Sequence, residues 1–136
     1  MKPVIQLEAT GCGIASAAAI AGVSYKKAKK IANQLGIYAD DSILWSDTQH
    51  VRKLLQHLGF RTGREEKSFR SWQSLPDYAL LSIKWHKDKG RPYWHWVVFV
   101  REGGREYVLD SKKALKNHRR TDFGRKRPKW YIEVHK

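Results

Sequence analysis

Hydrophobic positions recur every three or four residues through the first half of the chain, and this spacing predicts amphipathic helices. Residues 24–36 carry one such stripe. Ser24 stands where an N-cap is expected and Gly36 where a terminating glycine is expected. The apolar members of the stripe are Ala28, Ile31, Ala32 and Leu35.

The same pattern returns in residues 44–60, "LWSDTQHVRKLLQHLGF". Ser46 or Asp47 is expected to cap this helix, and Gly59 is expected to end it. The apolar stripe consists of Val51, Leu54, Leu55 and Leu58. We therefore predict a second amphipathic helix with one face on the core.

Residues 12–21 lack a polar face and are rich in alanine, so we expect a closely packed, buried helix there. Residues 1–11 are expected to be extended, because Pro3 and the β-branched residues after it disfavour a helix. The first half is thus predicted to hold three helices.

The second half changes to aromatic and β-branched runs separated by turn signals, which predicts strands. The sequence "EGGR" at 102–105 predicts a tight hairpin. Residues 112–128 are expected to form a charged connection. The predicted strands are 78–86, 93–102, 105–111 and a closing strand at 129–135, with a short edge strand within 60–70. We expect one α+β domain over residues 1–136, with the N-terminal helices packed on a C-terminal antiparallel sheet.

Charge adds a second property to this picture. The chain has 27 Lys and Arg against 13 Asp and Glu, a net charge of +14, which favours polyanionic partners such as nucleic acid or an anionic surface. Residues 118–120 and 124–130 place basic side chains beside Trp130. The longest apolar stretch, residues 13–23, is well short of the roughly 20 residues that span a bilayer, so we expect a soluble protein without a membrane span.

The single cysteine is the first candidate for chemistry. Cys12 lies between Gly11 and Gly13 at the predicted start of the alanine-rich helix. The helix N-terminus favours a thiolate over a thiol, and the glycines leave room for a substrate. The alternative is a small buried hydrophobic residue, which is the common role of a free cysteine.

A nucleophilic cysteine needs a base, and His95 is the histidine placed inside a strand that reads as central. A buried imidazole must satisfy both ring nitrogens, and a thiol on one side with an acid on the other would do so. Backbone carbonyls or solvent are the alternatives. The remaining histidines are expected elsewhere: His50 and His57 on a helix surface, His86 at a strand end, His118 in the basic connection and His135 near the C-terminus.

Asp110 is the predicted acid. With the hairpin turn at Gly103 and Gly104, residues whose numbers sum to about 207 face each other, so Asp110 lies diagonal to His95. Alternation places Trp94 and Trp96 on the opposite face, where we expect them in the core.

Gln6 stands just before the cysteine segment, and its uncharged amide is a suitable donor to an oxyanion together with the Cys12 backbone N–H. The alternative is an exposed glutamine in a terminal segment. The order Gln6, Cys12, His95 and Asp110 is therefore the candidate constellation.

Four segments together resemble papain-like cysteine peptidases, and more narrowly the bacteriocin-processing, double-glycine leader peptidase family. They are "QLEATGCGIASAAAIAGVSY", "DTQHVRKLLQHLGF", "YALLSIKWH…YWHWVVFV" and "YVLDS". The resemblance implies a papain-like fold and cleavage of a peptide or protein amide bond. It assigns Cys12 as nucleophile, His95 as its acid and base, Asp110 as the group that orients His95, and Gln6 as an oxyanion donor. No metal or organic cofactor is implied.

The sequence departs from that family at Gly11, where an acidic or small polar residue is common, and by lacking a nucleotide-binding P-loop sequence. Several roles therefore remain open: a processing enzyme, a toxin module with an acidic inhibitor or immunity protein, or a phage protein, acting in the cytoplasm or after delivery or secretion. A protein deamidase or acyltransferase with the same residues is one alternative function. A non-catalytic module that binds nucleic acid weakly or an anionic surface is another.

Overall fold

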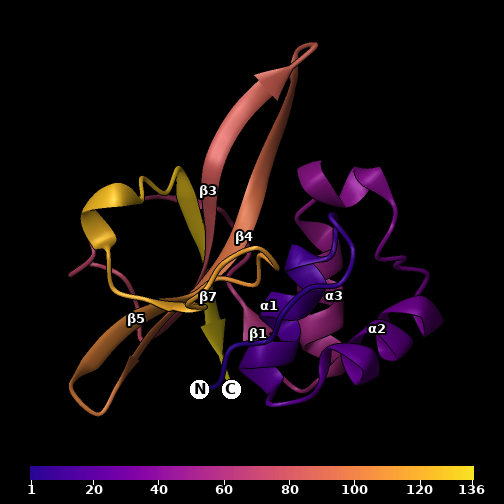
Figure 1. The fold of residues 1–136 in the computed structure, drawn as a ribbon, viewed down its shortest axis with the longest axis horizontal. Helices are drawn as coiled ribbons and strands as arrows, with labels where there is room; N and C mark the ends of the chain where they lie inside the picture. Colours follow the sequence, from indigo (N-terminus) through magenta and orange to yellow (C-terminus); the bar gives the residue numbers. More distant parts are fainter.

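The structure, a computed structural model, describes all residues 1–136 and is built of α-helices and an antiparallel sheet. Figure 1 shows the α-helices gathered on one side of the sheet, with the two chain ends close together. The helices are α1 (Cys12–Ala21), α2 (Tyr25–Gln34) and α3 (Gln49–His57), with short 3-10 helices η1 (Ser42–Ser46) and η2 (Phe123–Arg125). The expected α+β class and the expected order of helices before strands are confirmed.

The sheet has seven antiparallel strands in the order β1-β7-β3-β4-β5-β6, with β2 also paired to β7. The strands are β1 (Arg61–Thr62), β2 (Lys67–Ser68), β3 (Tyr78–Asp88), β4 (Arg91–Glu102), β5 (Arg105–Leu109), β6 (Arg119–Arg120) and β7 (Trp130–His135). The β3–β4 hairpin is long and projects beyond the rest of the sheet (Figure 1).

The register of β4 and β5 is the predicted one. Val98 pairs with Leu109 and Glu102 with Arg105, and each pair of numbers sums to 207. The tight turn is made by Gly103 and Gly104, which both have positive φ. This register carries the residue after β5, Asp110, to a position opposite Val97 and diagonal to His95 on β4.

The alanine-rich helix α1 is buried along its length, as expected, because nine of its ten residues are inaccessible. It packs against β4, where Trp96, Val98 and Val100 belong to the same core as the helix. A second, smaller core on the other face of the sheet contains Val97 and Phe99. Trp94 is also in the main core, so the expectation for both tryptophans is confirmed.

Helix caps agree with the sequence in part. The Ser24 hydroxyl accepts a hydrogen bond from the Lys27 N–H at 3.1 Å, as an N-cap does. At α3 the cap position is Thr48, whose side chain makes no capping bond, and Asp47 accepts from the His50 N–H at 2.8 Å instead. Asp47, one of the two predicted caps, therefore accepts a hydrogen bond from the first turn of α3, although it lies one position before the N-cap.

The expected edge strand within residues 60–70 is divided into two short strands, β1 and β2, which both pair with β7. The charged connection also differs from expectation, because it contains the short strand β6 and η2. The closing strand β7 lies between β1 and β3 rather than at an edge. No helix in the structure has the length and apolar character needed to cross a bilayer.

Candidate active site

Cys12 is the first residue of α1 and is 1% exposed. Gly11 and Gly13 on either side are required by close packing. A Cβ at Gly11 would lie 2.2 Å from the Tyr25 hydroxyl oxygen, and one at Gly13 would lie 2.3 Å from His50 Nε2. Tight packing on both sides fixes the turn that presents the sulfur, and it explains why a glycine precedes the cysteine here.

His95 and Asp110 form an ion pair, with His95 Nε2 2.7 Å from Asp110 Oδ1. Burial would lower the pKa of His95, but hydrogen bonding and charge at Asp110 and Cys12 outweigh burial and raise it to about 9. The imidazole is therefore paired with the Asp110 carboxylate, and Cys12 is near enough to contribute to its raised pKa. The structure brings together the three residues that the sequence singled out from distant positions.

Asp110 has a buried side chain that is held by several donors. Besides His95, the Lys112 N–H donates to Oδ1 at 3.1 Å and Arg120 Nη1 donates to Oδ2 at 3.4 Å. Burial would raise the pKa of Asp110, but these partners, chiefly His95, lower it. The residue is thus kept as a carboxylate beside the imidazole.

Gln6 is buried, rather than exposed in a terminal segment. Its Oε1 accepts from the Ser111 hydroxyl at 2.8 Å, and its Nε2 donates to Glu8 O at 2.9 Å and Ala9 O at 3.1 Å. The Gln6 N–H also donates to Ser111 O at 3.0 Å. These bonds join the segment before Cys12 to the residue after Asp110.

His50 was expected on the surface of its helix, and that prediction is wrong. The residue is 4% exposed and lies against Gly13, while its Nδ1 is 2.9 Å from Asp47 Oδ2. Its buried Nε2 has no hydrogen-bond partner. His50 therefore lies directly beneath the turn that carries Cys12, because the third helix is rotated so that this position faces α1.

Two hollows meet at His95. One, of about 370 Å³, is walled by aromatic side chains, including Trp45, Tyr93 and Trp94. The other, of about 500 Å³, is bordered by Gln6 and by lysines, and Lys84 lines both hollows. His95 is therefore accessible from two sides, whereas Cys12 lines neither hollow.

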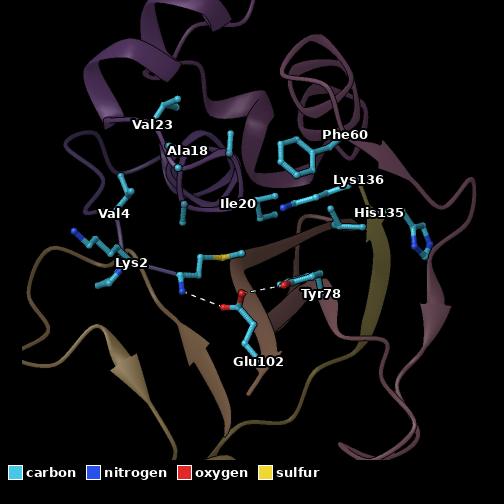
Figure 2. Close-up of a pocket in the computed structure, with 16 residues that line it drawn as sticks. Lys2, Val4, Ala18, Ile20, Val23, Phe60, Tyr78, Glu102, His135 and Lys136 are labelled. Atoms are coloured by element: carbon cyan, nitrogen blue, oxygen red, sulfur yellow. Dashed lines mark hydrogen bonds and ion pairs between the residues drawn. The ribbon is translucent and has the colours of Figure 1, made fainter. Parts of the chain in front are cut away.

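A further pocket lies at the opposite end of α1, away from these residues. Figure 2 shows part of its apolar wall, which includes Ile20 and Phe60, together with Glu102. The Met1 amino group forms an ion pair with Glu102 at 3.0 Å. Glu102 also accepts from the Tyr78 hydroxyl at 3.0 Å. None of the candidate site residues lines this pocket.

The basic stretch near the C-terminus does not form an exposed platform with Trp130. The Trp130 ring packs edge-on against Trp94 and Trp96, with centroids 5.0 and 5.4 Å away. Lys126 is buried and paired with Asp122 at 2.7 Å. The Trp130 ring is therefore engaged with other tryptophans and is not the open stacking platform that nucleic-acid binding would use.

Among the site residues that were not identified from the sequence are Ser111, Arg120 and Lys84. Ser111 directly follows the predicted acid, so its proximity could have been inferred from that neighbour. Arg120 reaches the site only because β6 pairs with β5, and no local sequence pattern predicts this pairing. Lys84 is placed by a bulge in β3, which the alternation of that strand does not indicate.

Comparison with known proteins gives a match by structure and none by sequence. No family model matches the chain, and no curated protein matches it. Among solved structures, the chain is similar to a double glycine motif protease from an AMS/PCAT transporter in complex with its leader peptide. The TM-score is 0.62 at 18% identity, over 98% of this chain and 90% of that chain. The two proteins therefore share a fold.

Proposed function

We propose that this protein is a papain-like cysteine peptidase that cleaves a peptide or protein amide bond. The observation that carries the proposal is the His95–Asp110 ion pair beside Cys12 at the start of a helix. A thiol, an imidazole and a carboxylate in this order are the parts that covalent amide hydrolysis needs. The fold shared with a double glycine motif protease supports the same reading.

The first step is attack by the Cys12 sulfur on the carbonyl carbon of the scissile bond. The helix N-terminus and the His95 imidazolium both stabilise a thiolate. As the tetrahedral intermediate collapses, the carbon–nitrogen bond breaks and His95 gives its proton to the departing amine. A thioester to Cys12 remains.

In the second step, a water molecule attacks the thioester carbon while His95 takes a proton from this water. The carbon–sulfur bond breaks, the peptide acid leaves, and the starting pair is restored. Asp110 holds the imidazole in one orientation and stabilises its cation, so it is a positioning residue in both steps.

The oxyanion site is assigned to the N-terminus of α1 and to Gln6. The first N–H groups of a helix have no partner within the helix, so the Cys12 N–H is free to donate to the oxyanion. Gln6 contributes by turning one amide N–H from a backbone carbonyl toward the substrate. The Ser111 hydroxyl donates to Gln6 Oε1, so the amide group of Gln6 is held with its oxygen toward Ser111 and its nitrogen on the opposite side.

A proteome-derived peptide library, incubated with the wild-type protein and with Cys12→Ala, tests this function. Mass spectrometry should find new peptide termini with the wild type and none with the variant. If the wild type leaves every backbone intact but converts glutamine or asparagine side chains to acids, the protein is a deamidase. If neither product forms, the hydrolase proposal fails.

A further inference from the structure

We propose that the substrate of this site carries acidic side chains on one side of the scissile bond, and that Lys84, Lys112 and Lys113 bind them. The inference rests on the proposed function, because it names the substrate class of the same site. It follows from the composition of the hollow of about 500 Å³ that borders His95 and Gln6.

The three lysines of this hollow have no acidic partner, since none of them takes part in an ion pair within the chain. One carboxylate, Glu8, is in the wall, but it is already occupied. Its Oε1 accepts from the Tyr25 hydroxyl at 2.7 Å, and its Oε2 is paired with Lys29 Nζ at 2.9 Å. The hollow therefore presents uncompensated positive charge next to the reacting groups.

Lys84 and Lys112 are held in this place by the backbone. Lys84 has φ of 54° in a bulge where the pairing of β3 with β4 shifts between Ile83 and His86. The Lys112 N–H donates to Asp110 Oδ1, so its side chain starts next to the carboxylate that orients His95. Burial and then the nearby Lys112 lower the pKa of Lys84, as expected for like charges brought together. A bound carboxylate would relieve that repulsion.

The second hollow is walled mainly by aromatic side chains rather than by lysines, so a substrate peptide is expected to bind in one orientation. Its walls include Trp45, Tyr93 and Trp94, and its single lysine, Lys84, is offset by a single acid, Asp88. An extended peptide over the site would thus place apolar or small residues against the aromatic walls and carboxylates against the lysines. Acidic residues are expected on one side of the cleaved bond only.

The test compares two triple variants with the same net charge, because a protein of +14 attracts any anion. The site variant is Lys84→Ala, Lys112→Ala and Lys113→Ala. The control variant is Lys26→Ala, Lys27→Ala and Lys30→Ala, which removes three exposed lysines without ion pairs from α2.

In the peptide-library assay, wild-type cleavage sites should be enriched in Asp or Glu on one side. The site variant should lose this enrichment, and its KM for a cleaved acidic peptide should rise about fivefold or more, the size expected for several partly exposed charge pairs. The control variant should match the wild type. Cleavage without acidic enrichment, or equal effects of the two triples, would overturn the inference and leave the peptidase proposal standing.

A binding measurement separates the inference from the proposed function. Binding of a rhodamine-labelled hexaglutamate peptide to the Cys12→Ala protein should weaken about fivefold with the site triple added and stay unchanged with the control triple. Local binding without any cleavage by the wild type would support the acid-binding hollow and refute the peptidase. Equal binding by the two triple variants would refute the claim that the lysines of this hollow bind acidic side chains.

Discussion

Asp110 shows how one side chain can be fixed by groups from separate parts of the chain. It accepts from His95 on β4, from the backbone after β5 and from Arg120 on β6. Each of these donors favours the carboxylate over the acid. Asp110 is therefore an anion that stays in place while His95 changes its protonation state.

Asp110→Asn should lower kcat/KM at neutral pH by roughly 10- to 1000-fold, because the imidazolium loses its carboxylate partner. The wild-type rate should fall as pH rises through about 9, where His95 loses its proton. In the variant this alkaline limb should move to lower pH. A pH profile of kcat/KM measures both effects, with Asp40→Asn, an exposed and unpaired acid, as the control. An unmoved limb would contradict the role given to Asp110.

Gly13→Ala should destabilise the protein by about 1–3 kcal/mol, because its Cβ would fall 2.3 Å from His50 Nε2 and 2.9 Å from Val51 Cγ1. Urea unfolding followed by tryptophan fluorescence measures the loss. Gly124→Ala, at a position with open space around it, is the control and should change little. A neutral Gly13→Ala would mean that His50 does not pack beneath the cysteine turn.

At the residue scale, the candidate catalytic residues could be predicted from the sequence, whereas the packing around them was harder to predict. His95 and Asp110 could be paired because the hairpin turn fixes their register. The burial of His50 could not be predicted. Helical periodicity indicates which residues form the apolar face of a helix, but it does not indicate how much of the border of that face is covered by a neighbouring helix. The apolar contacts of α3 with α1 decide that.

At the element scale, the N-terminal segment is attached to the end of β5 by Gln6 and Ser111. The segment forms no strand, so these hydrogen bonds, rather than a ladder, set the position of the residues before Cys12. Helix α1 then carries the cysteine from that fixed entry point.

Ser111→Ala should remove the hydroxyl that holds Gln6 Oε1, which costs about 1 kcal/mol of stability. Its larger effect should be on kcat, lowered several-fold because the Gln6 amide is no longer fixed in orientation. Steady-state kinetics on a cleaved peptide separate kcat from KM. Ser24→Ala, which removes the α2 cap, should cost similar stability and leave kcat unchanged. Equal kcat values for the two variants would refute the positioning role of Ser111.

Elements with a strong period, an alanine-rich run or a clear turn could be predicted from the sequence, including all three α-helices and the β4–β5 hairpin. Strand β6 could not, since it exists only through its pairing with β5, and neither could the division of the strand expected within residues 60–70 into β1 and β2. For the same reason, the insertion of β7 between β1 and β3 has no local signal.

At the scale of the whole molecule, acid stability should depend on the Asp47–His50 pair. The hydrogen bond from His50 lowers the pKa of Asp47 from 3.8 to about 2. A lowered carboxyl pKa stabilises the fold above the unfolded value, and this contribution is lost as pH falls through about 2.

Urea unfolding at pH 6 and at pH 2 should therefore show a larger loss of stability in the wild type than in Asp47→Asn, by about 1–2 kcal/mol. Asp40→Asn should behave as the wild type does. An identical pH dependence for Asp47→Asn and the wild type would contradict the contribution of this pair.

The direct test of the central claim, that Cys12 and His95 form an activated pair, is the rate of Cys12 alkylation by iodoacetamide at neutral pH, followed by mass spectrometry. The wild type should react at least about tenfold faster than His95→Ala, because an imidazolium beside the sulfur makes it a better nucleophile. His57→Ala, which removes an exposed histidine at the end of α3, far from the cysteine, should react as the wild type does. Equal rates for the wild type and His95→Ala would contradict the pair.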